Sequence, residues 1–86
     1  MYKILFAKSA LKEYEYLCGH NRNIFDRVRT AINGLAEDPS QGKQLRLSLK
    51  SQWSYRIGSY RIIYTIEHKK LVVLILDIGH RREIYR

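Results

Sequence analysis

The spacing of apolar residues changes from a helical period to a strand period at the turn formed by residues 38–42. Five apolar residues before the turn at 38–42 recur at helical spacing: Ile24, Val28, Ala31, Ile32 and Leu35. After that turn, apolar and polar residues alternate, or apolar residues run together, as in strands. The chain therefore combines helices with strands, and most of the strands lie in its second half, which excludes all-α and all-β folds.

The first half of the chain predicts one strand and two helices. Residues 2–7 are typical of a short, largely buried strand. Ser9 is a candidate N-cap for a first helix, and the break at 19–21 ends that helix. Either Asn21 or Asn23 could cap the second helix, so the two helices are expected to form an antiparallel hairpin.

The second half predicts a local, antiparallel arrangement of strands. Strand-like patterns cover 53–57, 60–66 and 71–76, and Leu45, Leu47 and Leu49 indicate a further strand or an extended approach to one. The 71–76 run is apolar on both faces, which favours a central position in the sheet. We therefore expect an α+β domain in the order β-α-α-β-β-β. Its antiparallel-rich sheet of about four to five strands would carry the helical hairpin on one face.

Length and composition are typical of a small intracellular protein. The 86 residues are enough for a single domain, 1–86, and 45% of them are hydrophobic, which favours a folded core. Cys18 is the only cysteine, so no intramolecular disulfide is expected and a reducing compartment is favoured. The longest apolar run, at 71–76, is far shorter than the roughly 20 residues of a membrane span. No signal peptide is evident. We expect a cytoplasmic protein with no membrane partner.

Positive charge is concentrated in the second half. The whole chain carries 16 Lys and Arg against 8 Asp and Glu, a net charge of +8. Residues 1–42 hold six basic and five acidic groups, whereas residues 43–86 hold ten basic and three acidic groups. An imbalance of this size within one small domain favours a nucleic acid or another strongly anionic partner.

Several classes of chemistry lack support in the sequence. The three histidines and the single cysteine do not have metal-ligand spacing, and no glycine pattern indicates a nucleotide cofactor. We therefore expect neither a metal nor a cofactor. What remains is a set of arginines and a tyrosine, on the 53–66 hairpin and in the terminal segment 79–86. Arginine forks match phosphate oxygens, which makes this set a candidate phosphate site.

The predicted hairpin gives that set a geometry. A two-residue turn at 58–59 would pair Ile57 with Tyr60 and Arg56 with Arg61. Directly opposed residues project to one face of a sheet with Cβ atoms about 5 Å apart. Two arginines placed there repel each other unless an anion lies between them.

RNA cleavage without a metal needs three groups. A base takes the proton of a 2′-OH, cations stabilise the charge on the phosphorane, and an acid protonates the leaving 5′-oxygen. Arginines supply the second group. A tyrosine among arginines has a lowered pKa, and His80 or Arg81 could supply or relay the other proton.

The stretches "WSYRIGSYRIIYTIE" and "LVVLILDIGHRREIYR" resemble the RelE branch of the RelE/ParE toxin superfamily, and the β-α-α order before them is similar too. The resemblance covers essentially the whole chain. It implies the toxin of a type II toxin–antitoxin system. Such a toxin is a ribosome-dependent endoribonuclease that cuts mRNA in the A site, encoded beside an antitoxin that blocks it.

The resemblance also implies roles for single residues. Arg61 matches the phosphate-stabilising arginine, Arg81 the second catalytic arginine, and Tyr85 the tyrosine that activates the 2′-OH or stacks on a base. Arg56 matches a strand position that is often Lys or Arg, and His80 matches an acid/base histidine of some relatives. Ser54 stands where the family pattern often has a further basic residue, so the general base stays open, with Lys50 or His80 as a substitute.

The remaining expectations concern binding and partners. Five basic residues are candidates for RNA contact: Lys43, Arg46, Lys50, Arg82 and Arg86. The expected partners are an acidic, adjacently encoded antitoxin, the 70S ribosome and mRNA. Two alternatives stay open: a ParE-like inhibitor of DNA gyrase on the same fold, and a non-catalytic module that binds RNA or an acidic partner.

Overall fold

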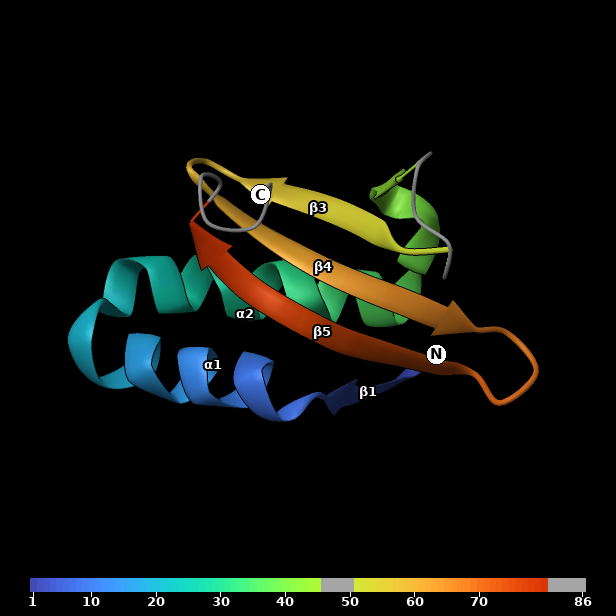
Figure 1. Cartoon of the computed structure of the whole chain (residues 1–86), viewed down its shortest axis with the longest axis horizontal. Helices are drawn as coiled ribbons and strands as arrows, with labels where there is room; N and C mark the ends of the chain where they lie inside the picture. Colours follow the sequence, from blue (N-terminus) through green and yellow to red (C-terminus); the bar gives the residue numbers. More distant parts are fainter. Residues whose placement is uncertain (46–50, 81–86) are drawn as a thin grey trace.

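The computed structural model describes residues 1–45 and 51–80, which form a five-stranded sheet with two helices packed on one face (Figure 1). The elements in chain order are β1 (Lys3–Phe6), α1 (Lys8–His20), α2 (Arg22–Glu37), the 3-10 turn η1 (Pro39–Gln41), β2 (Lys43–Gln44), β3 (Trp53–Ile57), β4 (Tyr60–Glu67) and β5 (Val72–His80). The strand order is β1-β5-β4-β3-β2, with β1 parallel to β5 and the other neighbours antiparallel. The predicted α+β class, the helical hairpin and the antiparallel-rich sheet are confirmed.

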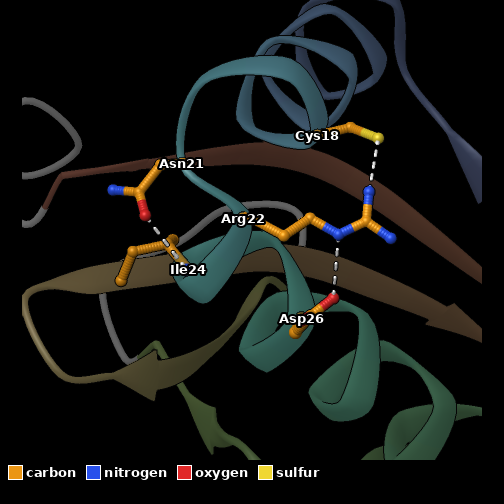
Figure 2. A network of polar contacts seen from close by, with 5 residues as sticks. All are labelled: Cys18, Asn21, Arg22, Ile24 and Asp26. Carbon is orange, nitrogen blue, oxygen red and sulfur yellow. Dashed lines mark hydrogen bonds and ion pairs between the residues drawn. The ribbon is translucent and has the colours of Figure 1, made fainter.

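Polar contacts between residues close together in the chain lie at the corner between the two helices (Figure 2). Asn21 caps α2, because its side-chain oxygen accepts a hydrogen bond from the N–H of Ile24 at 3.2 Å. This confirms Asn21 as one of the two predicted caps. Arg22 bridges the helices: it donates to the Cys18 sulfur at 3.6 Å, and its Nε lies 3.6 Å from the Asp26 carboxylate.

The start of α1 differs from the prediction. The helix begins at Lys8 with Ala7 in the N-cap position, and no side chain caps it. Ser9, the predicted cap, instead donates its hydroxyl to the Leu76 carbonyl of β5 at 3.3 Å. A link between helix and sheet therefore replaces the local cap. Neither helix in the described part of the chain is long and apolar enough to span a membrane.

The core lies between the helices and the sheet. Val28 and Leu35 of α2 are fully buried against Ile62 of β4 and Val73 and Ile75 of β5. Strand β5 lies between β1 and β4, so the strand predicted to be central is paired on both sides, although β4 is the middle strand of the five. Strand β5 continues beyond the 71–76 run to His80, so the first two residues of the terminal segment 79–86 belong to the sheet.

One β-bulge changes which residues of β5 face the helices. Tyr64 pairs with Ile75, but Ile63 pairs with Asp77, so Leu76 is an extra residue on β5. Because side chains alternate along a strand, one extra residue exchanges the two faces for everything after it. Val73 and Ile75 face the core before the bulge, and Ile78 faces it afterwards.

A buried tyrosine joins the sheet to the end of the helical layer. Tyr64 of β4 is fully buried, and its hydroxyl donates to the Pro39 carbonyl at 2.6 Å and accepts from the Gly42 N–H at 3.1 Å. A Cβ at Gly42 would collide with the Tyr64 hydroxyl and lie 2.8 Å from the Ser54 carbonyl, so only glycine fits. This contact, the Tyr64 clamp, fixes the chain immediately before β2.

Removing the clamp hydroxyl should destabilise the protein. In Tyr64→Phe the Pro39 carbonyl and the Gly42 N–H lose their shared partner, which should cost about 1–3 kcal/mol of unfolding free energy. Urea denaturation at pH 7 measures this. The matched control is Tyr16→Phe at an exposed site on α1, expected to change stability by less than about 0.5 kcal/mol. Equal stability of the two variants would show that the clamp contributes nothing.

The same hydroxyl predicts a pH dependence. Burial is the main cause that raises the pKa of Tyr64 from 10.0 to about 12. The unfolded chain therefore loses this proton first as pH rises, so the stability contribution is complete below about pH 10 and declines toward pH 12. Since Tyr64→Phe lacks the group, the stability difference between wild type and variant should shrink between pH 9 and pH 11 in urea denaturation. A constant difference across this range would contradict the shifted pKa.

Candidate functional site

The face of the sheet away from the helices carries a pair of arginines on adjacent strands. Arg56 of β3 lies directly opposite Arg61 of β4, and Ile57 lies opposite Tyr60, which confirms the predicted hairpin register. Gly58 begins the connecting turn with φ +57°, in the left-handed region that glycine adopts at little cost. The turn therefore places two cations side by side on the open face.

The register adds a third cation to this face. Lys43 of β2 pairs with Ser54, and Ser54 lies two residues before Arg56 on the same strand. Residues two apart on a strand share a face, so Lys43 projects with Arg56 and Arg61. On the other side, Gly79 of β5 pairs with Arg61 and offers no side chain. Arg61 thus has a cationic neighbour on one side and a glycine on the other.

Ser54 holds the Arg61 side chain in position. The Arg61 Nη1 donates to the Ser54 hydroxyl at 3.1 Å, Ser54 is only 3% exposed, and the Nε of Arg61 is buried as well. A half-buried guanidinium that already donates a hydrogen bond loses little further conformational freedom when it binds an anion. The position where the sequence departs from the RelE pattern therefore supports the arginine instead of supplying a base.

The three cations surround a cleft, here called the basic cleft. It has a volume of about 750 Å³ and is lined by residues 41–45, residues 54–56 and Arg61. No carboxylate is among these lining residues. Within residues 1–45 and 51–80, neither Lys43 nor Arg56 forms an ion pair with another side chain. The cleft is therefore suited to an anionic ligand with several acceptor oxygens, such as a phosphate.

His80 does not join this cleft in the structure. It pairs with Tyr60, whose ring packs on the core side of the sheet, and the two rings meet edge to face at 5.9 Å between centroids. The bulge at Leu76 is the cause, since it exchanges the faces of β5 before the strand reaches His80. His80 therefore projects from the face opposite Arg56 and Arg61.

Six of the predicted site residues lie outside the described residues: Arg46, Lys50, Arg81, Arg82, Tyr85 and Arg86. Their roles stay predictions. No group of three or more His, Cys, Asp or Glu side chains in the described ranges is placed to hold a metal ion.

The sequence did not predict the structural roles of Ser54 and Tyr64, whose hydroxyls position the residues that line the cleft. Ser54 supports Arg61, and the Tyr64 clamp fixes Gly42 next to Lys43. The hairpin register contained a signal for Ser54, because Arg61 lies diagonally across the strand pair from it. No local pattern indicated the clamp, whose partners are more than twenty residues apart in the chain.

Comparison with known proteins places these features in one family. The sequence profile of the ParE toxin of type II toxin–antitoxin systems, parDE, matches residues 4–85. The chain is 40% identical over 60 residues to toxin RelG of Mycobacterium tuberculosis, which covers 69% of each chain. It is 27% identical over 85 residues to toxin YoeB of Synechocystis, covering 93% of this chain and 99% of that toxin. Its fold matches a chain of the RelBE2 toxin–antitoxin complex of M. tuberculosis with a TM-score of 0.77 and 32% identity, covering 93% of this chain and 91% of that one.

Relieving the arginine pair should leave the fold intact and weaken anion binding. In Arg56→Gln the cross-strand repulsion with Arg61 disappears, so unfolding free energy at low salt should rise by about 0.2–1 kcal/mol. The gain in unfolding free energy should vanish near 1 M NaCl, where the Debye length is about 3 Å.

The same variant should bind phosphate more weakly, so the rise in melting temperature caused by inorganic phosphate should become smaller. Lys69→Gln, in the turn before β5, removes the same charge outside the cleft lining and should show neither effect. An equal phosphate response in both variants would contradict the predicted site.

Proposed function

This chain belongs to the ParE toxin family of type II toxin–antitoxin systems, within the RelE/ParE superfamily, and we propose that it is a ribosome-dependent endoribonuclease. Its substrate would be mRNA in the A site, and its effect would be inhibition of translation. The similarity to toxins RelG and YoeB supports this choice within the superfamily.

The observation that carries the proposal is the opposed pair of Arg56 and Arg61, with Ser54 holding the second guanidinium. Two forked cations about 5 Å apart at their Cβ atoms fit the equatorial oxygens of a phosphorane better than a single charge does. Ser54 holds the Arg61 guanidinium before substrate arrives, so little reorganisation of that side chain would accompany the reaction. Lys43 would bind a neighbouring part of the RNA backbone.

The reaction would be attack of the 2′-oxygen on the adjacent phosphorus without a metal ion. As the 2′-OH loses its proton, the bond from phosphorus to the 5′-oxygen breaks, and that oxygen gains a proton. This leaves a 2′,3′-cyclic phosphate and a 5′-hydroxyl. Arg61 and Arg56 would stabilise the phosphorane, and Arg81 would stabilise or protonate the leaving oxygen.

Tyr85 would take the 2′-OH proton or stack on a base, as the family resemblance implies. Of the two substitutes for the general base, His80 projects from the other face of the sheet, and Lys50 lies outside the described residues. Tyr85 would therefore carry more of the proton transfer from the 2′-OH. Ribosomal RNA would orient the mRNA, so the free protein should cut RNA poorly.

The proposed partners follow from the same family. The RelBE2 relative was solved as a toxin–antitoxin complex. We propose that this chain has a cognate antitoxin, which is encoded adjacently and is acidic enough to cover the basic cleft. The other proposed partner is the 70S ribosome, and the proposed location is the cytoplasm. A second candidate function is inhibition of DNA gyrase, which the ParE description of the matching profile favours. That function would not require Arg56 and Arg61 to oppose each other.

A translation assay separates these functions. Purified protein added to translating ribosomes should cleave mRNA at the A-site codon, and primer extension should locate the break. Arg61→Ala should lower the cleavage rate about 10²–10³-fold, because it removes a charge that stabilises the transition state. Arg81→Ala and Tyr85→Phe should lower the rate as well.

The matched control is Lys69→Gln, which removes a cation outside the cleft and should cleave at the wild-type rate. Gyrase-dependent DNA breaks with intact mRNA would overturn the proposal in favour of the second candidate. Efficient cleavage of a short free RNA would contradict the ribosome dependence.

A further inference from the structure

A second hollow lies on the helix side of the outer edge of β3, here called the α2 hollow. It has a volume of about 610 Å³ and is lined by Asp26, Arg27, Thr30, Ala31 and Gly34 of α2, by residues 55–58 of the hairpin and by Gln41. Gln41, Tyr55 and Arg56 line both this hollow and the basic cleft. The two therefore meet across the edge of β3.

They can meet because β2 is short. It pairs only with Trp53 and Ser54, and in the described part of the chain no strand covers the outer edge of β3 from Tyr55 to Ile57. A ligand lying in the basic cleft could thus continue over this edge into the α2 hollow. At the crossing it would meet Tyr55, which lines both hollows and whose partly buried side chain packs against the core on the helix side.

Arg27 is the cation that α2 contributes to the α2 hollow, which Arg56 of β3 also lines. The Arg27 guanidinium extends from α2 to the hairpin turn, where a Cβ at Gly58 would lie 3.5 Å from both terminal nitrogens. Within residues 1–45 and 51–80, Arg27 forms no hydrogen bond or ion pair through its side chain. Asp26 also lines the hollow, but the Arg22 guanidinium lies 3.6 Å from its carboxylate (Figure 2). The charge not balanced by a neighbour is therefore positive.

A ligand that occupies both hollows must be an extended polyanion. Arginine forks bind carboxylates and phosphates alike, so an acidic peptide and an RNA strand both satisfy the charge. The partly buried Tyr55, which lines both hollows, favours RNA, because a base can stack on an aromatic ring while the backbone follows the positive groove. Single-stranded RNA is thus the better fit.

We propose that the α2 hollow is a second phosphate-binding subsite, in which Arg27 binds the backbone of the same single-stranded RNA that occupies the basic cleft. The inference rests on the proposed function and extends it. The protein would bind several nucleotides of its substrate, on both sides of the outer edge of β3, in addition to the phosphate that reacts.

The test measures the salt dependence of binding to an oligonucleotide that cannot be cleaved. The probe is a fluorescent single-stranded RNA of about eight nucleotides with 2′-O-methyl groups, within the usual site size for such proteins. Its affinity is followed by anisotropy between about 50 and 200 mM NaCl. Each lost phosphate contact should make the slope of log K against log salt shallower by about 0.7 for a single strand. Arg27→Gln should show this change together with weaker binding.

Three further measurements sharpen the result. Arg29→Gln removes the same charge from the same helix outside the hollow and should keep the wild-type slope. Arg27→Lys keeps the charge but loses the fork, so the slope should stay while affinity falls. A two-nucleotide probe spans too little to reach both hollows, so Arg27→Gln and wild type should bind it equally. Melting curves establish that each variant is folded.

The outcomes separate this inference from the function on which it rests. If Arg61→Gln loses slope and Arg27→Gln does not, the second subsite is wrong and the proposed function stands. If Arg27→Gln loses slope and Arg61→Gln does not, the subsite is supported and the role of Arg61 is wrong. If Arg27→Gln weakens binding of an oligoglutamate peptide but not of RNA, the α2 hollow is a protein-binding site and the inference is overturned.

Discussion

The register between β3 and β4 is the constraint on which the rest of the site depends. A two-residue turn, with Gly58 in the left-handed region, sets Arg56 opposite Arg61. The apolar pair next to them, Ile57 and Tyr60, packs toward the core, so the arginines must face away from it. A slip of one residue would turn one cation into the core, where an unpaired charge is not tolerated. Hydrophobic burial on one face thus enforces charge repulsion on the other.

Two buried hydroxyls convert this pair into a shaped cleft. Ser54 fixes the Arg61 guanidinium from below, and the Tyr64 hydroxyl fixes the turn that leads into β2. Both lie within the sheet, and neither is a candidate for the chemistry. Their contribution is to hold the cations in a defined arrangement before an anion binds. The unfavourable proximity of like charges is maintained by contacts elsewhere in the fold, as is common at functional sites.

Local patterns predicted the fold and the arginine pair, because both follow from short-range rules. Helical spacing, the Asn21 cap and the two-residue turn each involve residues close together in the chain. Three features did not follow. Ser9 bonds to the sheet instead of capping α1, the clamp joins residues far apart in the chain, and the bulge at Leu76 moves His80 to the other face. All three depend on tertiary contacts or on a single extra residue, which sequence periodicity does not report.

That extra residue also has a consequence for how such a site can change over evolution. The bulge decides which face each later residue of β5 occupies, although it lies several residues before them. Loss of one residue there would move Ile78 and His80 to the open face and Gly79 to the core side in a single step, without any substitution near the cleft. A one-residue insertion or deletion in this strand therefore moves all the side chains that follow it to the opposite face of the sheet at once. Two sheets that differ by one residue in this strand can in this way carry different side chains at the same place on the open face.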